Sequence, residues 1–272
     1  NHIVGMDTME LPQLRRQKRR IDLSRIAGHI SRGVALINST VEPRAQYWDD
    51  WNQKNLQTQG PLWVALGDSV TQGIGSSDPS TCYVSIVLNR LEERTSQKWR
   101  LLNLSMSGAR FSDVTRLQIP LISDHDLKPD LVSVIIGSND IMWRRGPRRI
   151  ANDAKSLMES LPEGTYLSRV SQSNKKGRRS AIADVFETMA FSRGIELFGA
   201  WNWPTSEGMW AQDKFHPNDD AYRYIADNLW VVLGMIAAGA VWWQVHTRCE
   251  SAWASAFGLM VPVSYTHLRA HE

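Results

Sequence analysis

The stretch Leu131-Val132-Ser133-Val134-Ile135-Ile136-Gly137 decides the fold, and Ser138-Asn139-Asp140 follows it directly. A nearly continuous apolar run of this length, ended by a glycine, predicts a β-strand that is buried on both faces. Such strands belong to parallel sheets, because the helices that connect parallel strands cover both faces of the sheet. The stretch therefore predicts an α/β fold.

Similar apolar runs recur on both sides of this stretch, and they alternate with residues at helical spacing. We expect further strands at 62–66, 99–104, 165–170 and 195–198. Apolar steps of three and four predict helices at 83–91, 111–122, 181–189 and 222–229, with Pro120 disturbing the second. This alternation predicts a three-layer α/β/α, doubly wound parallel sheet whose ligand site lies beyond the carboxyl ends of the strands.

The composition suits one globular domain with extensions. The 272 residues are 42% apolar and 22% charged, which is typical of a folded chain rather than a disordered one. A net charge of +3 is too small to predict binding to nucleic acid. We place the domain at residues 58–235, a helical extension at 1–57 and a second extension at 236–272.

The two extensions carry no motif with a clear chemical role. Apolar residues between Ile21 and Leu36 predict one or two amphipathic helices. The basic residues from Arg15 to Arg20 predict a solvated helix start, with contact to an anionic membrane surface or to nucleic acid as the alternative. Residues 229–243 lack charge but are too few to span a bilayer, so we expect a packed helix, with membrane contact as the alternative. Residues 264–272 resemble a translated vector sequence, and we exclude them from the fold prediction.

The sequence predicts neither a cofactor nor a metal. Cys82 and Cys249 are too few and too far apart for a zinc site or a disulfide framework, so we expect reduced thiols in a cytoplasmic protein. We expect no signal peptide, because an unbroken apolar segment does not follow the basic residues near the N-terminus. The compact group Asp124-His125-Asp126 stands before Pro129, which predicts a surface loop rather than a metal site.

Three groups of polar residues and glycines follow the first three predicted strands. They are the segment from Gly67 to Gly75, which contains Asp68 and Ser69, the segment from Asn103 to Ala109, which contains Gly108, and Gly137-Ser138-Asn139-Asp140. The carboxyl ends of neighbouring parallel strands lie together, so we expect the three groups to form one site. The first group matches neither a P-loop, which needs a lysine, nor a dinucleotide fingerprint, since Asp78 stands in place of the third glycine. It also departs from the Gly-x-Ser-x-Gly nucleophile elbow of lipases, because Thr71 stands where that motif requires its second glycine.

A fourth group, Asp213-Lys214-Phe215-His216, precedes the last predicted helix. An aspartate three residues before a histidine can turn back so that its carboxylate meets the imidazole. Such a contact fixes the histidine tautomer and favours the imidazolium that forms when the ring takes a proton. The pair therefore predicts a general base at the edge of the site.

Together and in this order, the four groups resemble the sequence blocks of the SGNH hydrolases, also called GDSL esterases and lipases. The resemblance covers about residues 60–235 and implies a flavodoxin-like fold. It further implies that Ser69 is the nucleophile, His216 the base and Asp213 the acid that orients the base.

The resemblance also implies an oxyanion hole. Its donors would be the backbone N–H groups of Ser69 and Gly108 and the side chain of Asn139. Asp68 and Asp140 match positions in the blocks, and we expect them to order loops rather than to react.

We therefore expect a serine esterase or lipase that hydrolyses esters of small or short-chain acyl groups through an acyl-enzyme. Its partner would be a small ester substrate. An acyltransferase or a thioesterase on the same fold is the alternative within enzymes, and a non-catalytic module for carbohydrate or lipid is the alternative outside them.

Two groups near the predicted site have more than one interpretation. Trp201, Trp203 and Trp210 predict ordinary packing, with an aromatic wall beside the substrate as the alternative. The basic residues at 175, 176, 178 and 179 predict a solvated cluster, with a basic rim that attracts anionic substrates as the alternative.

Overall fold

The computed structural model describes residues 10–15, 32–142, 146–170, 177–199 and 208–234. The chain divides into two compact units, residues 1–230 and 231–272. The sheet and the predicted site belong to the first unit. Residues 235–272 lie outside the described part, and so does most of the uncharged segment 229–243.

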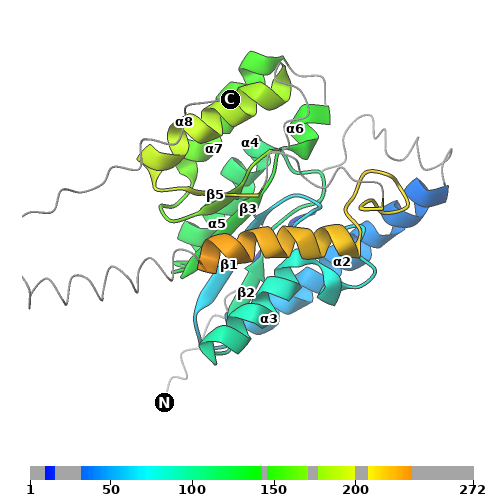
Figure 1. Ribbon diagram of the computed structural model, residues 1–272. Coiled ribbons are helices and arrows are strands. Elements are labelled where there is room, and N and C mark those ends of the chain that lie inside the picture. Colours follow the sequence, from blue (N-terminus) through cyan, green and yellow to red (C-terminus); the bar gives the residue numbers. More distant parts are fainter. Residues whose placement is uncertain (1–9, 16–31, 143–145, 171–176, 200–207, 235–272) are drawn as a thin grey trace, which may run out of the picture. The chain divides into compact units, whose positions relative to one another are not determined.

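A five-stranded parallel sheet forms the centre of the first unit (Figure 1). Its strands are β1 (Leu62–Gly67), β2 (Arg100–Asn103), β3 (Leu131–Ile135), β4 (Tyr166–Ser168) and β5 (Glu196–Phe198), in the order β2-β1-β3-β4-β5. All neighbours pair in parallel, which confirms the predicted doubly wound sheet. Because β2 and β3 lie on opposite sides of β1, the chain reverses its winding direction next to β1, and ligand sites form at such reversals.

The register brings the three predicted motif groups together. Ala65 pairs with Asn103 across β1 and β2, and Gly67 pairs with Ile135 across β1 and β3. The residues that follow these strands therefore leave the sheet together at the carboxyl ends of the strands, as the sequence predicts.

Helices cover both faces of the sheet. α7 (Pro147–Ser160) and α8 (Arg178–Ala190) lie on one side, while α3 (Tyr83–Thr95) and residues 219–230 of the last helix lie on the other (Figure 1). Alternate strand residues such as Val64, Leu66 and Val134 join a large core with Phe111 and Ile150. The remaining short elements are η1 (Pro79–Thr81), α4 (Phe111–Asp113), η2 (Val114–Gln118), α5 (Ile119–Asp124), α6 (Ser138–Met142) and η3 (Phe191–Arg193).

Pro120 does not end the helix that contains it. The chain stays helical from α4 through α5, and the turn before the proline widens into the π-helical segment η2, where the Ile119 N–H donates to Val114 O. Proline lacks an N–H and crowds the preceding turn of a helix, so a local change of hydrogen-bond register lets the helix continue. The widened turn ends at Gln118, whose side chain is fully buried.

Helix α2 (Arg32–Leu56) covers the free edge of β2. The Asn52 side chain donates to Asn103 O at 2.9 Å and accepts from Asn103 N at 2.8 Å, while the Trp51 indole donates to Leu101 O at 3.1 Å. These backbone groups point away from β1, so the two side chains replace the missing neighbouring strand. The domain boundary at residue 57 stays a prediction, although α2 packs directly on the sheet.

The structure departs from the predicted N-terminal segment at Arg15. This residue is not in a helix, and its guanidinium forms ion pairs with Asp49 and with Glu42, both on α2. The prediction of a solvated helix start is therefore wrong for Arg15, and residues 16–31 lie outside the described part. None of the described helices has the length and hydrophobicity needed to cross a bilayer.

Candidate active site

The turn after β1 positions Ser69. Gly67 has a φ of +142°, and a Cβ atom there would stand 2.2 Å from Ile135 O, so only glycine fits between β1 and β3 at this point. The Asp68 N–H donates to the same Ile135 oxygen at 3.2 Å. The chain thus turns sharply where the winding direction reverses, and Ser69 is the next residue.

The structure brings the three predicted catalytic side chains into one chain of contacts. Ser69 Oγ lies 3.0 Å from His216 Nε2, and His216 Nδ1 lies 2.5 Å from Asp213 Oδ2. The backbone N–H groups of Phe215 and His216 both donate to Asp213 Oδ1 at 3.0 Å. This is the hydrogen-bond connectivity that an activated serine nucleophile requires.

The surroundings of Asp213 keep it ionised. Burial raises the pKa of this carboxyl, but the hydrogen bond and charge of His216 and the two backbone donors outweigh burial and hold the pKa below its ordinary value. An ionised carboxylate only accepts hydrogen bonds, so Nδ1 of His216 carries the proton. Nε2 is then left to accept the Ser69 hydroxyl proton.

A second glycine allows the serine loop (residues 68–76) to approach the histidine loop (residues 210–217) closely. Gly75 has a φ of +100°, and a Cβ atom there would lie 2.4 Å from Pro217 O and 2.8 Å from His216 Cβ. This role of Gly75 was not predicted from the sequence. Its spacing from Ser69 alone does not reveal that the two loops touch.

The residues predicted as oxyanion donors lie beside the serine turn. Asn139 is buried at the start of α6, where its Nδ2 donates to Ala109 O at 3.0 Å and contacts Asp68 Oδ2 at 3.4 Å. Gly108, one residue before Ala109, has a φ of +79°. The second and third motif groups therefore meet next to Ser69, and their roles stay predictions.

Asp68 is a buried carboxyl directly before the serine. Burial raises its pKa from 3.8 to about 7, and the nearby charge of Asp140 acts in the same direction, against hydrogen bonds from Val70 N and Asn139. Asp140 in turn accepts from Phe111 N at 3.1 Å. Both aspartates thus bond to the loops around Ser69, which agrees with the ordering role that we expect for them.

Three amide side chains that were not predicted to be functional tie these loops together. Gln118 clamps Gly67, accepting from its N–H and donating to its C=O at 2.8 Å each. Gln72 accepts from Ser107 N at 3.0 Å and donates to Ser105 O at 3.1 Å. With the Asn52–Asn103 pair, these contacts hold the first two motif groups to each other and to the sheet. Each pairs residues far apart in sequence, so no local signal reveals it.

The first half of α2 lies under the histidine loop. A Cβ atom on Gly33 would stand 2.2 Å from Gln212 O, so the helix backbone directly touches the residue before Asp213. Ile37, half-buried Val41, Ile74 and Ala211 form a small hydrophobic cluster between the two loops. This half of α2 therefore contacts both the serine and the histidine loops.

The second half of α2 lies under the serine loop. The Trp48 indole donates to Gln72 O at 3.0 Å, and the Arg44 guanidinium donates to Ser76 O at 3.3 Å. With Gly33, Ile37, Val41 and Asn52, these residues follow one another at steps of three or four, so they form a single face of the helix. This face, which we call the loop-contacting face, contacts the serine loop, Asn103 and the residue before Asp213.

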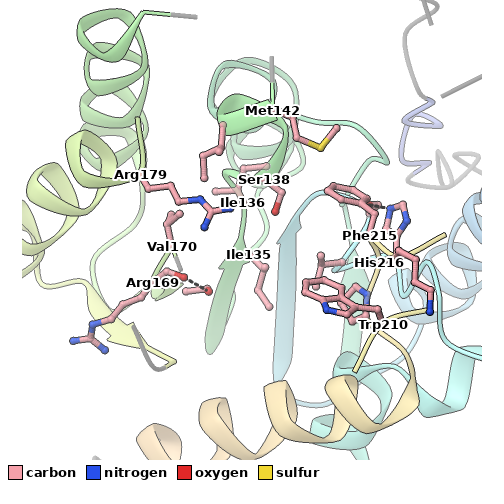
Figure 2. A pocket seen from close by; sticks show the side chains of 16 residues that line it. Ile135, Ile136, Ser138, Met142, Arg169, Val170, Arg179, Trp210, Phe215 and His216 are labelled. Atoms are coloured by element: carbon pink, nitrogen blue, oxygen red, sulfur yellow. Dashed lines mark hydrogen bonds between the residues drawn. The ribbon is translucent and has the colours of Figure 1, made fainter. Parts of the chain in front are cut away.

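A cavity of about 260 Å³ opens beside Ser69 and His216 (Figure 2). Its walls come from the ends of β3 and β4, from α6 and α8, and from the segment 210–217. Trp210 lines the cavity, whereas Trp201 and Trp203 lie outside the described residues. Arg179, which we expected in solvent, is half-buried and also lines the cavity.

No metal site is found in the part of the chain that the structure describes. His125, the histidine of the compact acidic group, contacts Leu121 O and Glu10 O through its two ring nitrogens. Cys82 is a buried free thiol, and Cys249 lies outside the described ranges.

Comparison with known proteins identifies the family. The model of the GDSL-like lipase/acylhydrolase family matches residues 65–224. The chain belongs to this family. The match confirms the predicted resemblance to the SGNH hydrolases and makes the protein a carboxylic ester hydrolase. The matched part of this GDSL hydrolase begins inside β1, so α2 lies outside it. No curated protein matches the chain.

Solved structures resemble the GDSL hydrolase in fold. TesA has a TM-score of 0.52 at 20% identity, with 63% of this chain and 97% of TesA covered. The esterase EstA from Pseudoalteromonas sp. has a TM-score of 0.54 at 16% identity, with coverage of 66% and 100%. A variant of Axe2, an acetyl xylan esterase from Geobacillus stearothermophilus, has a TM-score of 0.51 at 22% identity, with coverage of 65% and 95%. These likenesses support the three-layer fold.

Proposed function

We propose that this GDSL hydrolase is a serine esterase for small or short-chain acyl groups, with Ser69 as nucleophile, His216 as base and Asp213 as the acid that orients the base. The observation that carries the proposal is the continuous contact from Ser69 Oγ through the His216 ring to Asp213 Oδ2. Serine is a weak nucleophile at neutral pH, and a base within hydrogen-bond reach is what activates it.

The reaction proceeds through an acyl-enzyme. His216 Nε2 takes the Ser69 proton as the oxygen attacks the ester carbonyl, and the tetrahedral species collapses when the imidazolium returns that proton to the leaving alcohol. Water then attacks the acyl group on Ser69 with the same ring as base, which releases the carboxylic acid and restores the serine. Asp213 stabilises the imidazolium in both halves.

The negative charge on the carbonyl oxygen needs donors that are already in place. The backbone N–H groups of Ser69 and Gly108 and the Asn139 amide are our candidates. The Asn139 contact with Asp68 is the longer of its two contacts at 3.4 Å, so a substrate oxygen can replace it at small cost. One such donor contributes roughly 3–4 kcal/mol to transition-state stabilisation.

The cavity size supports small acyl groups. Its volume of about 260 Å³ lies below the roughly 300–1,000 Å³ of sites for drug-sized ligands. Apolar side chains of Ile135, Ile136 and Met142 line it, which suits a short hydrocarbon chain.

A nucleophile substitution tests the proposal. We expect Ser69→Ala to lower kcat for p-nitrophenyl acetate and butyrate by at least about 10³-fold, because removing a nucleophile abolishes the covalent route. Ser138→Ala is the matched control, since Ser138 also lines the cavity but contacts no predicted base. A fluorophosphonate probe should label the wild type and the control but not Ser69→Ala. Turnover retained by Ser69→Ala, or its labelling by the probe, refutes the assignment.

A further inference from the structure

The cavity beside Ser69 has an apolar body and a basic end. Ile135, Ile136, Ile141, Met142 and Val170 form most of its apolar wall. Among the described residues that line it, the charged side chains are Arg169, Arg179 and Lys214, and none is acidic. A site with charges of one sign and low-dielectric walls concentrates ligands of the opposite sign.

The two arginines differ in where their charge is directed. Arg169 forms an ion pair with Glu187 at 2.9 Å and donates to Leu197 O at 2.9 Å, which draws its guanidinium away from the cavity. Figure 2 shows this guanidinium pointing outward, whereas that of Arg179 extends toward Ile136 and Ser138. Arg179 is therefore the arginine whose charge faces the cavity.

The surroundings of Arg179 suit recognition of an anion. The residue is half-buried on α8 and lies across the cavity from His216 (Figure 2). A guanidinium offers five N–H donors in a planar arrangement that matches a carboxylate or a phosphate. Apolar walls lower the local dielectric constant, so the attraction between the two charges is stronger than in water.

We propose that the substrate of this GDSL hydrolase is an ester that carries a carboxylate or phosphate, separated from the scissile carbonyl by a short apolar segment, and that Arg179 binds this anion. The inference rests on the proposed function for the position of the scissile bond. The apolar wall holds the hydrocarbon segment, and Arg179 selects esters with an anionic end over neutral esters of the same length.

Matched substrates test the proposal and show which side of the ester carries the anion. The acyl-side pair is the p-nitrophenyl monoester of adipic acid and p-nitrophenyl hexanoate. The alcohol-side pair is 3-carboxyphenyl acetate and phenyl acetate. For the wild type we expect the anionic member of at least one pair to have the higher kcat/KM by about 10- to 100-fold, the range expected of one charge-assisted contact.

Variants of Arg179 should remove this preference. In Arg179→Met the ratio of anionic to neutral kcat/KM should fall to near one, and Arg179→Lys should retain part of it because the charge remains. Arg116→Met is the control for net charge, since Arg116 is exposed on η2 and does not line the cavity. Equal ratios in wild type and Arg179→Met, or no preference in either pair, overturn the proposal.

A binding measurement separates this proposal from the proposed catalytic mechanism. Calorimetry on Ser69→Ala should detect adipate monomethyl ester or 3-carboxyphenyl acetate, with at least tenfold weaker binding when Arg179→Met is added. Anion binding that depends on Arg179 supports the site even if Ser69→Ala retains turnover. Binding unchanged by Arg179→Met overturns the site even if Ser69 is the nucleophile. Unfolding temperatures identify any variant that fails to fold, and Arg179→Lys then carries the test.

Discussion

Gly75→Ala should damage catalysis more than it damages stability. An added Cβ atom would stand 2.8 Å from His216 Cβ and 2.4 Å from Pro217 O, where ordinary contact begins near 3.4 Å for a carbon. The histidine loop must therefore move away from the serine loop by roughly 0.6 Å or more, and misplacements of about 1 Å can cost about 10²-fold in rate. This movement lengthens the 3.0 Å contact between Ser69 Oγ and His216 Nε2. We expect kcat for p-nitrophenyl butyrate to fall by about 10- to 100-fold.

Backbone strain at Gly75 needs its own control. The φ of +100° is unfavourable for alanine whatever the space around it. Gly164 has a φ of +76° and nothing within 4 Å of its added Cβ, so Gly164→Ala carries the strain without the collision. Backbone strain alone should cost each variant roughly 1–2 kcal/mol in the free energy of unfolding, measured in urea. If both variants keep wild-type kcat, or if kcat falls equally in both, the close approach of the two loops does not position His216.

Asn52→Ala should destabilise the protein by roughly 2–4 kcal/mol in urea unfolding, because it leaves Asn103 N and O buried without partners. Asn55→Ala is the control, since Asn55 Nδ2 bonds only within α2 to Trp51 O, and an equal loss in both variants contradicts the edge-covering role. Asp68 should lower the free energy of unfolding as pH rises. Its pKa is 3.8 in the unfolded chain and about 7 in the folded protein, so the folded state holds the proton more tightly. The resulting stabilisation is complete below pH 3.8 and is lost as pH rises toward about 7. The free energy of unfolding of wild type minus that of Asp68→Asn should therefore decrease between pH 4 and 7, and a flat or rising difference contradicts the raised pKa.

The strands could be predicted because their sequences are almost wholly apolar. β1 and β3 were expected within two residues of their observed ends, since Leu62–Leu66 and Leu131–Ile135 are buried on both faces of the sheet. The outer strands β4 and β5 are shorter than predicted, with three residues each. α7 was missed, although Ile150, Ala154, Leu157 and Met158 have helical spacing and are its buried residues.

The packing of helix α2 could not be predicted from the sequence. The expected amphipathic pattern lay between Ile21 and Leu36, whereas the described helix extends to Leu56 and contains Pro43. Its buried residues include Arg44 and Asn52, polar side chains that hydrophobic periodicity counts as exposed. Their partners are backbone groups of residues far along the chain, and only the folded structure shows them.

The predicted site residues were found from motif order and strand ends, and the structure places them together. The amide clamps of Gln72 and Gln118 were missed because glutamine in a turn or a helix is ordinary, and each acts on a backbone group more than 30 residues away. Arg179 was assigned to solvent because it stands in a basic run, which is usually exposed. Its position in the cavity depends on how α8 packs against α7, and this packing cannot be predicted from the local sequence.

The loop-contacting face of α2 has a consequence for how the enzyme matures. During synthesis α2 leaves the ribosome first among the described helices, yet Gly33 touches Gln212 and Ile37 packs on Ala211, which are made near the end of the sheet-bearing unit. Contacts between residues so distant in the chain form late in folding, because the long intervening loop must first close. The nascent chain should therefore remain inactive until the histidine segment has emerged and docked, and esterase activity would report completion of folding of this unit.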